Sequence, residues 1–217
     1  MNYLAHATLA EPTDDARLGS LLGDFQRGLE RERFSADVVY AIGEHIALDV
    51  HFDALPRVRE LRRSFPDHLV RFAGVLIDVF LDHALVRNWD ALIRVHGGPA
   101  LSDVTSSLYR ALDRNAQSLP PRLARIAPRI IESDWLGSYG DIDNIARALE
   151  GIASRLKRPT PLVEGIEVLR ERGPEFDALA QNTIPELVTW LSDRRVRDGR
   201  SGAIVEVTER QDHRIAR

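Results

Sequence analysis

The sequence contains no cysteine, a single lysine and no long apolar run, and each absence excludes a class of protein. Without cysteine there is no disulfide and no thiolate metal site, so any metal must be held by His, Asp and Glu. No stretch reaches the about 18 apolar residues that a membrane-spanning helix needs. The N-terminal stretch MNYLAHATLAEPTDD lacks a basic region and a long apolar segment. We therefore expect no signal peptide, no membrane partner and, by default, a cytoplasmic protein.

The charge is balanced, with a formal net value of −4 at pH 7. This excludes a global basic field that would recruit nucleic acid. Lys157 is the only lysine among 29 basic residues, so 28 are arginine. A GC-rich coding bias explains this composition, and recognition of phosphate or carboxylate by planar guanidinium groups is a second explanation. Both can hold.

The hydrophobic pattern has a helical period nearly throughout and predicts one all-α domain. We expect helices at 16–29, 36–52, 54–64, 66–87, 100–116, 121–134, 141–156, 161–171 and 174–194. No alternating β-branched run of useful length occurs before residue 200, although AIVEV at 203–207 suits an extended piece. We place a single-domain helical bundle at 1–193 and a polar, arginine-rich tail at 194–217, which we expect to be mobile.

Polar residues with metal-ligand chemistry lie in four apolar stretches of the first half. In DVFLDHALVRNW (78–89), Asp78 and Asp82 are four residues apart and share a helix face. Charged groups rarely enter such surroundings without a partner or a metal. The other members are Asn2 and His6 at i, i+4, Asp24 after Gly23, His45, Asp49 and Asp53 at i, i+4, i+8, and His83 beside Asp82.

Two interpretations of these residues remain open at this point. Facing helices with i, i+4 pairs of His and Asp form a common carboxylate–imidazole metal site. Burying several carboxylates without a cation is unfavourable, because like charges raise one another's pKa. Alternatively, the acids are structural and pair with arginines. The available arginines are Arg57, Arg59, Arg62, Arg63, Arg71 and Arg87.

Five segments resemble a known family when they are taken in order. They are MNYLAHATLA, GSLLGDFQRG, HIALDVHFD followed by PRVRELRR, GVLIDVFLDHALVRNW, and WLGSYGDIDNIARALEGIASR at 135–155. With these motifs the chain resembles the acyl carrier protein phosphodiesterases over about residues 1–190. The matching positions are Asn2, His6, Asp24, His45, Asp49, Asp53, Arg71, Asp78, Asp82, His83 and Trp89.

The resemblance implies an α-helical fold, distantly related to the HD-type metal phosphohydrolases and distorted from them. It implies hydrolysis of the phosphodiester that joins 4′-phosphopantetheine to a serine of holo acyl carrier protein. The products would be apo carrier protein and 4′-phosphopantetheine. The cofactor would be a divalent metal, most often Mn²⁺, with Mg²⁺ or another divalent ion as alternatives.

Roles follow as expectations from this resemblance. His6 would be a metal ligand or a general acid, Arg71 would clamp a phosphate oxygen, and Asp78 would orient a histidine. Asp82 and His83 stand in the reverse order of the HD dipeptide, so we expect only one of them to point into the site. The expected metal ligands are Asp24, His45, Asp49, Asp82 and His83. Asp24 would also be catalytic.

The carrier protein is acidic, so we expect a local basic surface to recognise it. The candidates are Arg27, which follows Asp24, and Arg59, Arg62 and Arg63 in PRVRELRR. Two other functions remain open. One is an HD-like metal phosphohydrolase that acts on a small nucleotide or phosphodiester. The other is a non-catalytic helical module that binds carrier protein.

Overall fold

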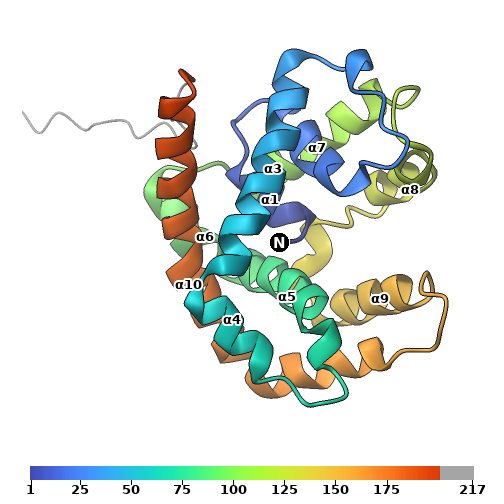
Figure 1. Cartoon of the computed structure of the whole chain (residues 1–217), viewed down its shortest axis with the longest axis vertical. Coiled ribbons are helices and arrows are strands. Elements are labelled where there is room, and N and C mark those ends of the chain that lie inside the picture. Colours follow the sequence, from blue (N-terminus) through green and yellow to red (C-terminus); the bar gives the residue numbers. More distant parts are fainter. Residues whose placement is uncertain (201–217) are drawn as a thin grey trace, which may run out of the picture.

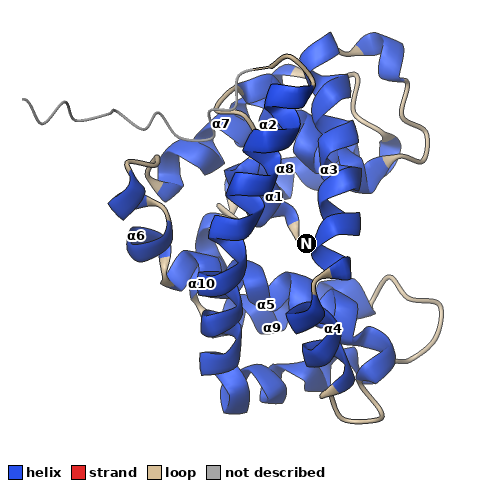
Figure 2. Ribbon diagram, turned by 60° about the vertical axis from the view of Figure 1, so that its left-hand side comes forward, coloured by secondary structure: helices blue, strands red, loops and turns tan. Residues whose placement is uncertain are grey.

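In the computed structural model, which describes residues 1–200, every regular element is a helix (Figures 1 and 2). This confirms the predicted all-α class. The α-helices are α1 (Tyr3–Leu9), α2 (Asp14–Leu22), α3 (Ala36–Ala54), α4 (Pro56–Arg63), α5 (Ala73–Arg87), α6 (Trp89–Leu92), α7 (Leu101–Arg114), α8 (Pro121–Glu132), α9 (Ile142–Ala153) and α10 (Gly165–Arg197). Short 3₁₀ turns are η1 (Gly23–Phe25), η2 (Arg31–Arg33), η3 (Val70–Phe72), η4 (Arg94–His96), η5 (Gly137–Gly140) and η6 (Pro161–Glu164).

Local sequence signals explain where several helices begin. The Thr13 hydroxyl accepts a hydrogen bond from the Ala16 amide at the start of α2, and Ser35 caps α3 in the same way through Val38. Pro56 and Pro121 are the first residues of α4 and α8, where a missing N–H has no intrahelical partner to lose.

Helix α1 lies at the centre of the molecule. The hydrophobic pattern of the sequence did not predict it as a helix. Every residue from Leu4 to Leu9 is buried, so the helix has no polar face to create a period. It lies close to α2, α5 and α7, and the N-terminus appears in the middle of Figure 1 with α1, α3 and α5 around it. This central position brings His6 next to α3.

Several helix boundaries differ from those expected. The helix predicted at 16–29 ends at Leu22, and the one predicted at 66–87 begins as an α-helix only at Ala73. The helices predicted at 161–171 and 174–194 are joined within α10, which has non-helical angles at Arg172 (φ −117°, ψ 18°). Pro174 follows two residues later and cannot continue the hydrogen-bond ladder, which accounts for the kink.

The end of α10 is anchored beyond residue 193, where we placed the domain boundary. Arg195 is fully buried, and its guanidinium donates to Glu44 Oε1 and Oε2 at 2.7 and 2.8 Å and to the Leu9 carbonyl at 2.9 Å. The helix therefore continues to Arg197. Residues 201–217, which include AIVEV and most of the predicted tail, lie outside the described residues.

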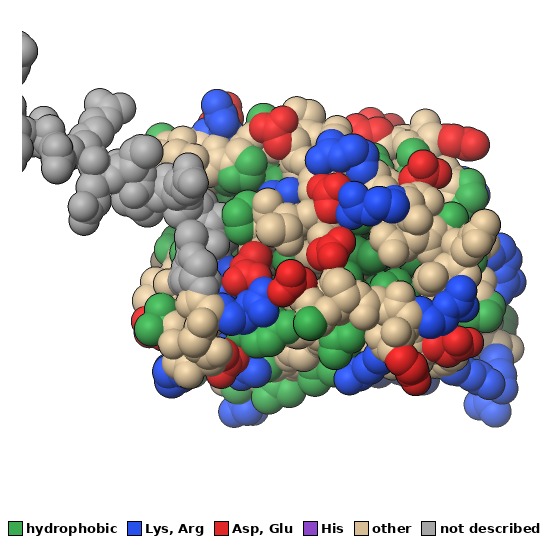
Figure 3. Space-filling view, turned by 90° about the horizontal axis from the view of Figure 1, so that it is seen from above, with side chains coloured by type: hydrophobic (Ala, Val, Ile, Leu, Met, Phe, Trp, Pro, Cys, Tyr) green, Lys and Arg blue, Asp and Glu red, His purple; other side chains and the backbone are tan. Residues whose placement is uncertain are grey.

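The described surface mixes charges of both signs. On the end of the molecule seen in Figure 3, blue basic and red acidic side chains lie side by side among apolar ones. The interactions of Arg110 and Arg114 with Asp14 are of this kind, at 3.2 and 3.5 Å. Among residues 1–200, no helix combines the length and apolar character that crossing a membrane requires.

Candidate metal centre and the adjoining cleft

Three side chains from α1 and α3 form the one group in residues 1–200 whose His and carboxylate ligand atoms all lie within 4.8 Å of one another. They are His6, His45 and Asp49. Asp49 Oδ1 lies 3.0 Å from His6 Nε2, and Asp49 Oδ2 lies 3.2 Å from His45 Nε2. The two imidazole rings stack with their centres 3.7 Å apart. The i, i+4 spacing of His45 and Asp49 predicted their shared face, and the packing of α1 adds His6.

The orientation of His45 is fixed by its second ring nitrogen and by Gly23. His45 Nδ1 lies 2.6 Å from the Ser20 carbonyl oxygen. Because a carbonyl oxygen only accepts hydrogen bonds, Nδ1 carries the proton and Nε2 faces the carboxylates. Gly23 packs against the ring so closely that a Cβ there would lie 2.1 Å from His45 Cγ. The glycine thus allows the imidazole to approach the chain just before Asp24.

The donor set fits a divalent cation. In a neutral His45 with its proton on Nδ1, the Nε2 lone pair points at Asp49 Oδ2 and lies 3.7 Å from Asp24 Oδ1. Lone pairs facing each other are unfavourable unless a proton or a metal ion lies between them. Two imidazole nitrogens with one or two carboxylates are also a common ligand set for divalent transition-metal ions.

The protonation states agree with this donor set. Burial lowers the pKa of His6 to about 3, so its imidazole is neutral at pH 7 and can act as a ligand. Burial alone would raise the pKa of Asp49. The adjacent His45 and His6 side chains and the Met1 α-amino group outweigh that effect and hold the pKa of Asp49 well below its usual range. Asp49 is therefore ionised.

The surrounding acids carry negative charge that the protein only partly compensates. Burial and the Asp49 carboxylate raise the pKa of Asp24, although His45 opposes the shift. Burial likewise raises the pKa of Asp78, against the effect of the Met1 α-amino group, which lies 3.2 Å from Asp78 Oδ1 and 2.8 Å from Asp49 Oδ1. A bound cation would relieve this repulsion.

Asp82 and His83 are not part of this group. Both Asp82 oxygens accept hydrogen bonds at 2.9 Å from the Leu4 and Ala5 amides at the start of α1. Burial nevertheless raises the Asp82 pKa to about 7. His83 Nδ1 donates to the Tyr139 carbonyl oxygen at 2.7 Å, which directs the ring toward η5. Asp82 holds α1 in place, and with it His6.

Asp53 and the predicted arginines lie at the surface of the protein. Asp53 forms an ion pair with Arg62 at 2.6 Å, and the Arg59 Nε donates to the Asp53 carbonyl oxygen. Arg27 and Arg63 are exposed, and neither has an ion-pair partner among residues 1–200. Arg71 is exposed on η3, where its guanidinium carbon lies 4.9 Å from the centre of the Phe72 ring.

A cleft of about 620 Å³ adjoins the cluster through Asp24, and sequence reasoning did not assign it. Its residues come from the N-terminus, α5, α8, α9 and the loops beside them. They are Met1, Asn2, Tyr3, Asp24, Val75, Asp78, Val79, Arg122, Arg125, Ile126, Trp135, Tyr139, Ile152, Arg155 and Leu156. The arginines belong to PRLARIAPR and IARALEGIASR, whose spacing is also typical of ordinary solvated helix faces.

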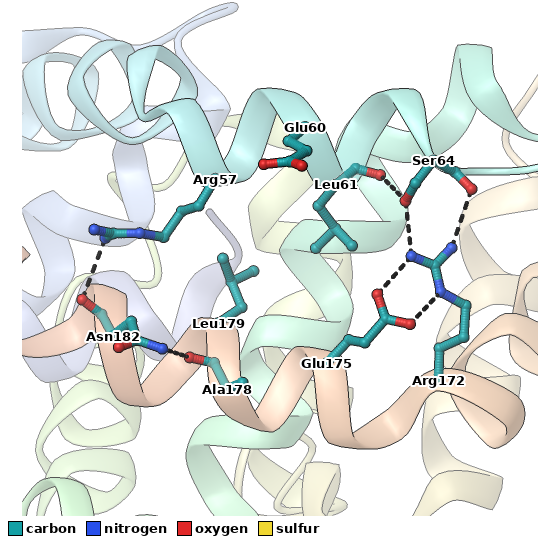
Figure 4. Close-up of a pocket in the computed structure, with 9 residues that line it drawn as sticks. All are labelled: Arg57, Glu60, Leu61, Ser64, Arg172, Glu175, Ala178, Leu179 and Asn182. Atoms are coloured by element: carbon teal, nitrogen blue, oxygen red, sulfur yellow. Dashed lines mark hydrogen bonds and ion pairs between the residues drawn. The ribbon is translucent and has the colours of Figure 1, made fainter.

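A second pocket, of about 380 Å³, lies between α4 and α10 and differs in character (Figure 4). Arg57 donates to the Asn182 carbonyl oxygen at 3.2 Å and pairs with Glu186. Arg172 donates to Glu175 and to Ser64 Oγ, both at 2.7 Å. These arginines connect the two helices within the protein itself.

Comparison with known proteins agrees with the resemblance found in the motifs. The family model described as "Acyl carrier protein phosphodiesterase" matches residues 1–187. A protein of that name from Photorhabdus laumondii is 32% identical over 188 residues, which cover 87% of this chain and 93% of the relative. One from Escherichia coli O45:K1 is 35% identical over 82% of this chain and 87% of the relative. One from Yersinia enterocolitica is 30% identical over 90% of this chain and 100% of the relative.

No solved structure matches the chain, so the distant relation to HD-type phosphohydrolases stays a prediction. The family match covers far more than half of the chain, and it includes every residue of the His–Asp cluster and of the cleft. The chain belongs to the acyl carrier protein phosphodiesterase family.

Proposed function

We propose that this chain is a cytoplasmic enzyme that hydrolyses the phosphodiester between 4′-phosphopantetheine and a serine of holo acyl carrier protein. Water adds to phosphorus and the bond to the serine oxygen breaks, which leaves apo carrier protein and 4′-phosphopantetheine. One observation carries the proposal: Asp24 belongs both to the surroundings of the His6–His45–Asp49 cluster and to the wall of the cleft. A phosphate at Asp24 would therefore contact both.

In this proposal His6, His45 and Asp49 hold a divalent ion, Mn²⁺ or Mg²⁺, with Asp24 as the adjacent carboxylate. Such an ion, when bound, would lower the pKa of a water molecule and neutralise charge that develops on the phosphoryl group. The Ser20 carbonyl keeps the proton on His45 Nδ1, and so leaves Nε2 available as a ligand. Asp82 keeps α1, and thereby His6, in register.

Asp24 has the exposure that a reacting group needs. Its side chain is 39% exposed, whereas the His45 side chain is 3% exposed. The Asp24 carboxylate can therefore contact both a phosphate in the cleft and the attacking water, orient that water and accept its proton.

The carrier protein would be recognised by arginines that the fold leaves available. Arg27 and Arg63 are exposed and unpaired within residues 1–200, so they are the members of the predicted basic set that can meet an acidic partner. Arg59 and Arg62 bind Asp53, and they would take part only by exchanging or sharing that contact.

The test is mass spectrometry of holo acyl carrier protein after incubation with the enzyme, with Mn²⁺ or with EDTA. The proposal predicts that the carrier loses the mass of the phosphopantetheinyl group only when metal is present. No loss from a folded, metal-loaded enzyme would favour a hydrolase of small phosphodiesters. Carrier binding with no loss and no bound metal would favour a non-catalytic module.

A further inference from the structure

The cleft beside Asp24 contains arginines that no carboxylate of residues 1–200 neutralises. Arg122, Arg125 and Arg155 line it, and none has an acidic oxygen within ion-pair distance in the described part of the chain. The Arg155 Nε, just after the end of α9, donates to the Gly151 carbonyl oxygen in the last turn of that helix, and the Arg122 guanidinium carbon lies 5.5 Å from the Phe25 ring centre. Their remaining donors are free for a ligand.

Arg122 lies near the end of the cleft that contains Asp24. Phe25, over which it stacks, directly follows Asp24, and the Tyr3 ring lies 5.9 Å from Phe25. Burial raises the pKa of Tyr3 to about 12, Asp24 adds to this shift, and the charges of Arg122 and Arg155 oppose it. Tyr3 therefore experiences the fields of all three groups. A phosphate beside Asp24 would lie within reach of the Arg122 guanidinium.

The remaining walls of the cleft are apolar. Val75 and Val79 of α5, Ile126 of α8, and Trp135 and Ile152 enclose it. The hollow adjoins a second one of about 440 Å³, which shares Ile126, Trp135 and Arg155 with it. The cleft volume lies in the range of about 300–1,000 Å³ that is usual for small-molecule sites.

We infer that this cleft binds the 4′-phosphopantetheine arm of the substrate, an assignment that rests on the proposed function. Arg122 binds the phosphate oxygens, and Arg155 donates to an amide carbonyl further along the arm. The dimethyl and methylene groups of the arm pack on Trp135 and the aliphatic wall. A phosphate with an extended, largely uncharged chain suits a basic end that continues into an apolar channel. An acidic protein surface would instead leave the apolar walls uncovered.

The test is isothermal titration of 4′-phosphopantetheine, and separately of apo carrier protein, into the Mn²⁺-loaded enzyme and three charge-matched variants. Arg122→Gln and Arg155→Gln alter the cleft. Arg170→Gln is the control. This substitution removes the same charge from an exposed part of α10, where Arg170 pairs with Glu167. Both cleft residues are exposed, so their variants are expected to fold.

We expect each cleft variant to weaken 4′-phosphopantetheine binding by about tenfold or more, with apo carrier affinity unchanged and the control like wild type. The inference would be overturned if both cleft variants bound 4′-phosphopantetheine as tightly as the wild type, or if they lost only apo carrier binding. It would also be overturned if the wild type did not bind 4′-phosphopantetheine. If holo carrier is still hydrolysed in those cases, the proposed function stands without it. Arginine-dependent binding without hydrolysis would leave the cleft assignment and remove the proposed function.

Discussion

Two arginine-bearing regions of this protein have opposite characters. Between α4 and α10, Arg57 and Arg172 donate to carboxylates, a hydroxyl and backbone carbonyls, so their hydrogen-bonding capacity is used within the fold (Figure 4). Along the cleft beside Asp24, Arg122 and Arg155 have no carboxylate partner among residues 1–200. An arginine that is satisfied internally stabilises the fold, whereas an unpaired one beside a cleft is available to an anion.

A dense cluster of arginines in the sequence does not mean that those arginines are free to bind a ligand in the structure. PRVRELRR is the most basic short stretch that we singled out, yet Arg57 and Arg62 there form ion pairs with Glu186 and Asp53. The cleft arginines come from two segments about thirty residues apart and look unremarkable in each. Whether a carboxylate lies opposite an arginine is decided by packing, which the local sequence does not encode.

The largest effect is expected where the cleft meets the His–Asp cluster. Asp24→Ala should reduce kcat/KM for holo carrier by about 100-fold or more, because it removes a carboxylate that contacts the attacking water. Thermal unfolding should change little, since the side chain is 39% exposed. Mass spectrometry of the carrier measures the loss of activity, and thermal melting by circular dichroism measures the stability. Loss of folding together with activity would make Asp24 a structural residue.

The second-largest effect is expected from Arg195, a fully buried arginine that pairs with Glu44. Arg195→Gln leaves Glu44 as an unpaired buried carboxylate, so the free energy of unfolding should fall by about 3–5 kcal/mol. Urea unfolding measures it, and Arg170→Gln serves as the exposed-pair control, with an expected change below about 1 kcal/mol. Equal effects of the two variants would contradict the assignment of Arg195 as a buried anchor.

A smaller effect tests the α4–α10 region itself. Arg172→Gln removes the connection from α10 to Ser64 at the end of α4, and it should lower the free energy of unfolding by about 1 kcal/mol. The value of kcat/KM for holo carrier should stay at the wild-type level. A kinetic defect in a stable Arg172 variant would mean that this region also binds substrate, and would remove the contrast between the two regions.

The smallest effect is expected from the exposed, unpaired arginines of the predicted basic set, Arg27 and Arg63. In the double variant Arg27→Gln/Arg63→Gln, KM for holo carrier should rise about two- to fivefold, because rim charges contribute modestly to affinity. The dependence of KM on salt should flatten, while kcat and the affinity for 4′-phosphopantetheine stay unchanged. Steady-state kinetics at several salt concentrations measures this. An unaltered salt dependence would place carrier recognition elsewhere.

Much of the fold and part of the site could be predicted from the sequence. Helical periodicity predicted the all-α class, and the i, i+4 spacing of His45 and Asp49 placed them on one face. These inferences rest on local geometry, which a single stretch of chain determines.

The remaining features depend on contacts between distant segments. Asp82 follows the same spacing rule as Asp49, but its oxygens bind the start of α1 because of how α5 packs. Helix α1 is buried on all sides, so its pattern has no period. Arg122 and Arg155 gain their significance only because the fold brings α8 and the segment after α9 to the cleft that Asp24 also lines.

The most direct test of the account is an anomalous difference map from crystals grown with Mn²⁺ and 4′-phosphopantetheine. The account predicts a manganese peak within coordination distance of His45 Nε2 and an Asp49 oxygen. It also predicts that the phosphate lies beside Arg122 and the arm along Trp135. A peak away from the His6–His45–Asp49 cluster, or an arm bound between α4 and α10, would contradict it.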